Sequence, residues 1–348
     1  MLKISPEYIN QVKQATVPED LFGPLQSALM LEHSTIPPYL TAMFSLKPGK
    51  NLYIREVIHS IVIEEMLHLT IVANILNALG GSPVLNNKNF IPQYPGPLPM
   101  GIGDQLVVGL TKYSTDQVKN VFMEIEEPEI PLVIPEMKSF KAAKVDYHTI
   151  GEFYKEIQAK IAELAISTMP GDPKKQVVSA FFKADQLFPI TNTQDAQKAI
   201  DIIVEQGEGT DKSPAFDLDE IAHYYKFEEL YKGRKIVADS DSPLGYSFSQ
   251  EPIPFDADEV FNFFPNTKSD MIPPEHEGYR LINQFNFSYA TLLNGLNRTF
   301  NGEPDFLPHT IGIMYDLKLL AEKLGSMNFP GKKGYTIGPS FEYVEVNL

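Results

Sequence analysis

The stretch NLYIREVIHSIVIEEMLHLTIVANILNAL, residues 51–79, decides the fold of this chain. Its apolar residues recur three and four positions apart, which is the spacing of one face of an α-helix. Gly80 and Gly81 follow directly and end the pattern. The sequence therefore predicts one long helix over residues 51–79. Its core-facing stripe consists of Ile54, Ile58, Ile61, Val62, Leu69, Val72 and Leu76.

A second long helix is predicted immediately before the first, over residues 21–46. It carries its apolar residues at the same helical spacing, at Leu25, Leu29, Ile36 and Leu40. The turn at residues 47–50, KPGK, ends this helix and leaves a short connection. Two long helices joined by so short a turn form an antiparallel hairpin. The adjacent Pro37 and Pro38 lack backbone donors, so we expect them to kink the first helix.

The rest of the chain is predicted to be helical with long irregular connections. We expect further helices at 114–125, 149–168, 172–185, 193–208, 219–232, 275–300 and 304–327. The connections are predicted to be a loop at 81–109 with a short strand near 106–110, an irregular stretch at 127–146 and a coil at 233–274. The fold class is therefore mainly α, with a helical bundle over residues 1–235. Residues 236–348 form a coil and helical extension that packs on the same domain.

Charge and composition exclude several classes of protein. Lys and Arg number 29 against 45 Asp and Glu, which gives a net charge of −16. This balance argues against binding to nucleic acid and to anionic membranes. Cysteine is absent, so disulfides, thiolate nucleophiles and iron–sulfur clusters are excluded. The polar N-terminus and the lack of an apolar run of about 20 residues predict a soluble, cytoplasmic protein.

Two polar residues interrupt the apolar stripe of the helix at 51–79. Glu65 lies four residues after Ile61 and three after Val62, and His68 lies four before Val72. Both side chains therefore point toward the core. An unpaired carboxylate there would cost several kcal/mol in desolvation. Glu-x-x-His is the spacing with which a bundle helix presents two metal ligands. A glutamate at the helix edge beside a hydrogen-bonded histidine is the alternative.

Glu32 places a second carboxylate on an apolar stripe, three residues after Leu29. It lies 14 residues before Leu46, and Glu65 lies 14 residues after Asn51. Because an α-helix rises about 1.5 Å per residue, an antiparallel hairpin puts the two carboxylates at the same height. Packing alone does not explain two buried carboxylates and an imidazole at one level, so the sequence favours a metal site.

The same arithmetic applies to the helices at 149–168 and 193–208. Glu152 lies three residues inside the start of one helix, and Glu205 lies three residues before the end of the other. Antiparallel neighbours would bring these carboxylates level, so both are candidate metal ligands. For Glu152 the alternative is a capping box, in which Thr149 is the N-cap and Glu152 bonds the N-cap amide.

A second histidine ligand is expected from the helix at 219–232. The residue three positions after Glu205 is Glu208, so the Glu-x-x-His pattern is broken there. His223 is the best candidate because it shares a helix face with Phe227. Glu220 precedes it at the expected spacing and is an alternative partner, which would leave Glu205 outside the ligand set. Core packing is the expected role of the nearby tyrosines Tyr39, Tyr154 and Tyr224.

Together these residues resemble the ferritin-like di-metal carboxylate bundle, and more specifically the ferritin-like domain of the iminophenyl-pyruvate dimer synthases of violacein-type biosynthesis. The segments that carry the resemblance are LQSALMLEHSTIPPYLTAMFSL, IVIEEMLHLTIVANILNALGGSP, FMEIEEPE, TIGEFYKEI, IVEQGEGT, HYYKFEEL and GPSFEY. The similarity runs from about residue 21 to 232, with weaker traces beyond. It implies a ferritin-like four-helix bundle that uses iron for an oxidative reaction on a small imine derived from an amino acid.

The expected ligand set has four carboxylates and two neutral imidazoles, whose four negative charges two divalent cations would neutralise. It comprises Glu32, Glu65, His68, Glu152, Glu205 and His223. Oxygen-rich ligation suits Fe(II) or Mn(II), and Zn(II) is the alternative metal. We expect Glu32 or Glu65, or both, to bridge the ions, and no side chain beyond the ligands to act in catalysis.

The leading hypothesis is a non-haem di-iron oxidase or oxygenase that takes O₂ or peroxide and a small organic substrate. Two alternative functions are compatible with the same helical bundle. One is an iron-binding, ferritin-like storage protein, and the other is a metal-free scaffold without enzymatic activity. The sequence is compatible with a homo-oligomer as well as with a monomer.

Overall fold

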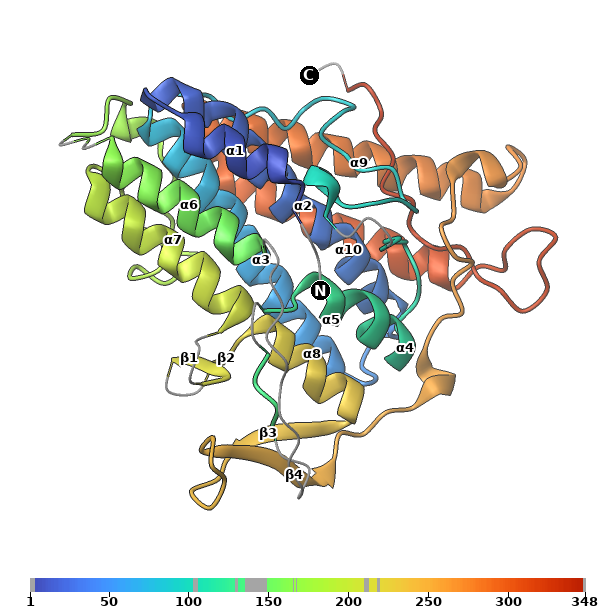
Figure 1. Cartoon of the computed structure of the whole chain (residues 1–348). Coiled ribbons are helices and arrows are strands. Elements are labelled where there is room, and N and C mark those ends of the chain that lie inside the picture. The colour runs from blue at the N-terminus through green and yellow to red at the C-terminus, as the bar shows by residue number, and fades with distance from the viewer. Residues whose placement is uncertain are drawn as a thin grey trace.

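Two long helices joined by a short turn form the centre of the molecule (Figure 1). They are α2 (Phe22–Ser45) and α3 (Leu52–Ala78), which pack along each other in antiparallel directions. The structure is a computed structural model that describes residues 4–102, 106–128, 131–134, 149–164, 166, 168–209, 213–217 and 220–346. Both predicted hairpin helices are confirmed to within a residue or two at each end.

Two further helix pairs flank this hairpin (Figure 1). One pair is α6 (Ile150–Glu163) with α7 (Thr193–Glu208), and α7 packs against α3. The other pair is α9 (Glu277–Phe300) with α10 (Leu307–Gly325), which pack against α3 and α2 respectively. The α2–α3 hairpin therefore contacts neighbouring helices on two sides.

Shorter elements complete the bundle. The remaining α-helices are α1 (Pro6–Gln14), α4 (Thr115–Gln117), α5 (Met123–Ile125) and α8 (His223–Lys232). A π-helical turn, Val118–Phe122, joins α4 to α5. Two antiparallel two-stranded sheets consist of β1 (Ala215–Asp217) with β2 (Glu220–Ile221), and β3 (Arg234–Ala238) with β4 (Tyr246–Pro252). Single 3₁₀ turns lie at Pro18–Leu21, Pro99–Gly101, Pro173–Lys175, Ala257–Glu259, Ser269–Met271 and Pro304–Phe306.

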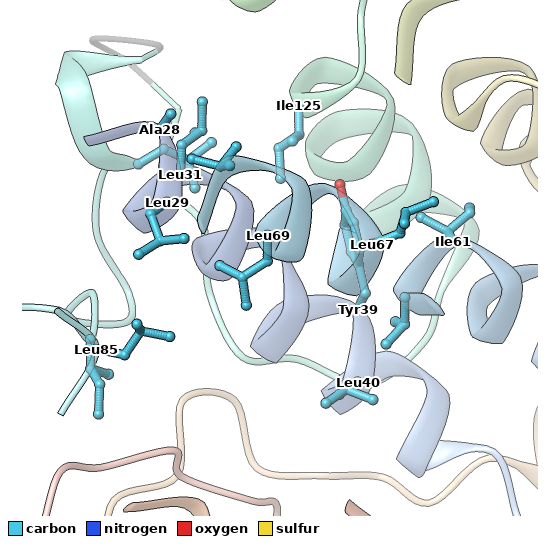
Figure 2. Close-up of a cluster of buried hydrophobic side chains, with 14 of the residues drawn as sticks. Ala28, Leu29, Leu31, Tyr39, Leu40, Ile61, Leu67, Leu69, Leu85 and Ile125 are labelled. Atoms are coloured by element: carbon cyan, nitrogen blue, oxygen red, sulfur yellow. The ribbon is translucent and has the colours of Figure 1, made fainter. Parts of the chain in front are cut away.

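The α2–α3 hairpin has two different faces. In Figure 2, Leu29, Leu40 and Leu69 lie on one side, and the Tyr39 hydroxyl points to the other side, toward the helix that carries Ile125. All of these side chains are buried. Apolar packing on both faces explains why the second half of α3 is apolar nearly all round, since such a helix belongs in a core.

Helix α2 continues through Pro37 and Pro38. Pro38 cannot donate to the carbonyl of Ser34 four residues earlier. The Tyr94 hydroxyl donates to that carbonyl instead, at 2.6 Å. A side chain from the loop after α3 thus satisfies a buried backbone group that the proline leaves without its helical donor.

Helix α3 is long and apolar enough to cross a membrane by length and composition alone. Its most apolar window has a mean hydropathy of 1.4, but 83% of that window is buried inside the molecule. Most of this helix is therefore covered by the rest of the chain.

The predicted helix at 172–185 is wrong. The structure has one 3₁₀ turn there, and the backbone N–H and C=O of Val177 bond to the side chain of Asn74 on α3, both at 2.8 Å. The side chain of Gln176 likewise bonds to the backbone of Ile190. These bonds take the place of helical ones, and the segment is irregular with short turns.

Other boundaries differ locally. The helix predicted at 149–168 ends at Glu163, and the one predicted at 219–232 begins at His223, after strand β2. The stretch 233–274, expected as coil, contains the β3–β4 hairpin. A single bridge between Gly96 and Val108 stands where a short strand was expected. Of the irregular stretch 127–146, residues 129–130 and 135–146 lie outside the described residues.

We predict that Asn74→Leu lowers the free energy of unfolding by about 2–4 kcal/mol, because the buried N–H and C=O of Val177 lose their partners. Urea denaturation followed by circular dichroism measures the loss. Asn10→Leu, at an exposed position of α1, is the matched control and should change stability by less than about 0.5 kcal/mol. Equal losses in the two variants would contradict the role of Asn74.

Candidate metal centre

Three potential metal ligands meet inside the α2–α3 hairpin. Glu32 comes from α2, and Glu65 and His68 come from α3. One ligand atom from each lies within 4.8 Å of the other two. Their side chains are buried, with exposed fractions of 5%, 3% and 2%. The structure therefore brings the two hairpin carboxylates together at one level, as the helix register predicted.

A second group of three lies beside the first and shares Glu65 with it. Its other members are Glu126, which directly follows α5, and His223, the first residue of α8. Their ligand atoms again lie within 4.8 Å of one another. The rings of His68 and His223 are stacked with centroids 5.5 Å apart. Glu65 thus stands between two Glu/His groups.

Both imidazoles turn the same nitrogen toward the carboxylates. Nδ1 of His223 lies 2.9 Å from Glu65 Oε1, and Nδ1 of His68 lies 3.5 Å from Glu32 Oε2. The opposite nitrogen, Nε2, faces Glu64 at 2.8 Å in His223 and Gln206 at 2.9 Å in His68. With an acceptor facing each Nε2–H, the neutral tautomer presents the Nδ1 lone pair.

Hydroxyl groups orient the three carboxylates. Thr35 donates to Glu65 Oε2 at 2.9 Å, and Tyr39 donates to Glu126 Oε1 at 2.5 Å. Tyr154 donates to Glu32. Tyr39 and Tyr154 pack in the core, as expected, and their hydroxyls also hold carboxylates in place.

The centre attracts protons in the absence of metal. Burial raises the pKa of Glu65 to about 7, and the charge of Glu126 adds to this effect. Burial acts to lower the pKa values of both histidines, but the close carboxylates outweigh this effect and raise them. The site therefore favours bound positive charge.

Glu64 is different because it lies beside two cationic groups. Burial would raise its pKa, yet the hydrogen bond to His223 and the ammonium of Lys226, 2.7 Å from Oε2, lower the pKa to about 2. Glu64 is therefore ionised over the whole physiological range, and it faces the His223 nitrogen that points away from the other carboxylates.

These donors fit a metal ion. His223 Nδ1 is buried and makes no hydrogen bond of acceptable geometry, although carboxylate oxygens lie 2.9 and 3.5 Å away. A cation between these atoms would satisfy them together, and mixed carboxylate and imidazole donors suit Fe(II), Mn(II) or Zn(II). Five residues would hold the metal, namely Glu32, Glu65, His68, Glu126 and His223.

A small cavity of about 50 Å³ adjoins these side chains. The carboxylates of Glu32, Glu65 and Glu126 line one part of it, and apolar side chains such as Ile125 and Ile203 line another. Its volume suits water or a diatomic molecule, because a cavity needs about 10–15 Å³ of such space to hold one water molecule.

Four of the six sequence-predicted ligands come together here, and two do not. Glu205 lies on the exposed face of α7, where the inward position belongs to Gln206, which is 1% exposed. Glu152 occupies the third position of α6, and its backbone N–H donates to the side chain of the N-cap Thr149. Neither belongs to a group of potential ligands among the described residues. The alternative partner Glu220 pairs with Lys183 instead.

Glu126 is the site residue that the helical periodicity missed. It lies in the segment FMEIEEPE, just after a helix that the π-helical turn Val118–Phe122 interrupts. The periodic pattern does not show which glutamate of this acidic segment points inward. The resemblance rested partly on this segment and was the one available signal.

We predict that the metal-free protein becomes less stable as the pH rises. Folded Glu65 keeps its proton up to about pH 7, whereas an ordinary glutamate loses it near 4.5. The folded state binds more protons in this interval, so the free energy of unfolding falls with rising pH, by roughly 3 kcal/mol. The raised pKa values of His68 and His223 act in the same direction, because the stability they add is lost as pH rises through them.

Calorimetry in the presence of EDTA, across about pH 5 to 8, measures this slope. Glu65→Gln removes the ionisable group and should flatten the profile. A melting temperature that rises over this range, or an unchanged slope in the variant, would contradict the assignment.

Comparison with known proteins agrees with this architecture. The ferritin-like family model matches residues 25–232. A crystal structure of a ferritin-like protein from Caulobacter vibrioides is similar, with a TM-score of 0.60 and 22% sequence identity over 93% of this chain and 97% of that chain. No curated protein matches the chain. Because the family model spans more than half of the sequence, this chain belongs to the ferritin-like family.

Proposed function

We propose that this protein is a non-haem di-metal oxidoreductase that acts on a small substrate derived from an amino acid. One observation carries the proposal, which is that Glu65 is shared by two buried Glu/His groups. Glu65 would therefore help to hold a cation in each of the two groups. Ferritin-like domains commonly bind di-iron, which makes iron the first metal to test, with manganese and zinc as alternatives.

Bound iron would supply the electrons for reduction of O₂ or peroxide. The protein's own residues prepare the site for that chemistry. Thr35, Tyr39 and Tyr154 fix the carboxylates through their hydroxyls, and the buried surroundings exclude bulk water. The cavity of about 50 Å³ has room for the oxidant.

The charge of the ligand set favours an anionic substrate. Among the described residues it contains three carboxylates, so two divalent cations would leave one unbalanced positive charge. A substrate carboxylate beside the centre would neutralise it. This supports an amino-acid derivative and agrees with the resemblance to iminophenyl-pyruvate dimer synthases, whose reaction couples aromatic imines. Oxidative coupling of such an imine in the cytoplasm is the specific activity we propose.

Metal content tests the ligand assignment. Protein purified without chelator should contain roughly two metal ions per chain by elemental analysis. Glu65→Gln should lose most of both ions, and Glu126→Gln should lose about one, because Glu126 belongs to one group. Glu205→Gln is the matched control and should retain the metal, since its side chain is exposed. Trace metal in the wild type, or equal loss in Glu205→Gln, would refute the proposed centre.

Oxygen consumption tests the reaction. Iron-loaded protein should consume O₂ in an electrode chamber when an aromatic α-imino acid is added, and Glu65→Gln should reduce the rate at least about a hundredfold by removing the shared ligand. Uptake that follows Fe(II) alone and ignores the imine would indicate iron oxidation for storage. No uptake by protein with full metal content would contradict the proposed oxidase.

A further inference from the structure

A second and larger cavity lies on the other side of the α2–α3 hairpin. Its volume is about 180 Å³, and α2, α3, α9 and α10 form most of its wall. The wall is built largely from aliphatic and aromatic side chains, including Leu40, Met66, Leu69, Leu293 and Ile311. A cavity of this kind weakens the fold when it is empty, and an apolar cavity near 150 Å³ is already large enough to hold benzene.

The cavity and the metal centre use different faces of the same helices. Glu65 and His68 face the metal centre, and Met66 and Leu69, the residues directly after each of them, line the cavity. Figure 2 shows the same division, with Leu40 and Leu69 on the side opposite the Tyr39 hydroxyl. Tyr39 in turn donates to Glu126 of the centre. The cavity and the metal centre therefore do not overlap.

One cationic side chain, that of Lys318, lies at the mouth of the cavity. The exposed residues in its wall include His59, Tyr315 and Lys318. Burial lowers the pKa of His59, and the charges of Lys318 and Arg55 lower it further, which places these groups near one another. Lys318 makes no ion pair with any residue that the structure describes.

Acidic residues are absent from the described wall of this cavity. This is notable in a chain with 45 Asp and Glu and a net charge of −16. Two polar side chains in the deep wall pair with each other. The Nε2 atom of the buried His33 lies 2.8 Å from the Tyr289 hydroxyl. His33 Nδ1 has no hydrogen-bond partner among the described residues. The cavity thus combines an apolar interior with an unpaired ammonium at its entrance.

We propose that this cavity binds one molecule of an amphipathic monocarboxylic acid, with its hydrocarbon body among the apolar side chains and its carboxylate at the mouth beside Lys318. Apolar burial would supply most of the affinity. The ammonium would select the anion over uncharged or cationic molecules of the same length. The carboxylate stays in partial contact with water, so it avoids the cost of full desolvation.

Isothermal titration calorimetry of the full-length protein with decanoate, below its micelle concentration, tests this proposal. We expect saturable binding of one molecule per chain and a higher melting temperature. Decanol should bind about fivefold more weakly, and decylammonium more weakly still, because neither offers a negative charge to Lys318. Equal affinity for decanoate and decanol, or no saturable binding, would overturn the proposal.

Two variants and a control locate the binding site. Lys318→Glu should weaken decanoate binding about tenfold and change decanol binding less than about twofold. Lys323 is exposed on the same helix and lies outside the cavity wall, so Lys323→Glu should leave the binding of decanoate and of decanol unchanged. Ile311→Trp should abolish binding of both by filling the cavity, with metal content unaltered. Decanoate binding that survives Ile311→Trp, or is insensitive to Lys318→Glu, would contradict the assignment.

Discussion

A buried carboxylate among other carboxylates needs positive charge beside it, and Glu65 is where this requirement is strongest. It lies in the middle of the longest helix, 3% exposed, and belongs to both groups of Glu and His side chains. The α2–α3 hairpin brings Glu32 to it, and the end of α5 and the start of α8 bring Glu126 and His223. Much of the surrounding architecture serves to hold these anionic groups together.

The two imidazoles are supported differently, so the two halves of the centre are not equivalent. Nε2 of His223 faces the ionised Glu64, which Lys226 also contacts, whereas Nε2 of His68 faces the neutral amide of Gln206. A charged acceptor makes an imidazole a stronger base and a stronger ligand than a neutral acceptor does. The half that contains His223 is therefore expected to bind a cation more tightly.

Sequence periodicity located the part of the site that lies on long, regular helices. Glu32, Glu65 and His68 interrupt the apolar stripes of two long, regular helices, and a fixed rise per residue sets their heights. Periodicity did not locate residues whose direction depends on the local backbone geometry. On α7 a difference of one residue separates the exposed Glu205 from the buried Gln206. In the stretch 172–185, Val177 bonds to Asn74, which is about a hundred positions away in the chain and leaves no local signal.

The π-helical turn Val118–Phe122 has a consequence for how such a centre can change. A π-turn accommodates one more residue than a regular turn, which rotates every following side chain by about 100° around the helix axis. Glu126 follows this turn, so its direction depends on the number of residues before it as well as on its own identity. Inserting or deleting one amino acid in this π-helical turn would therefore move the Glu126 carboxylate into or out of reach of the other ligands.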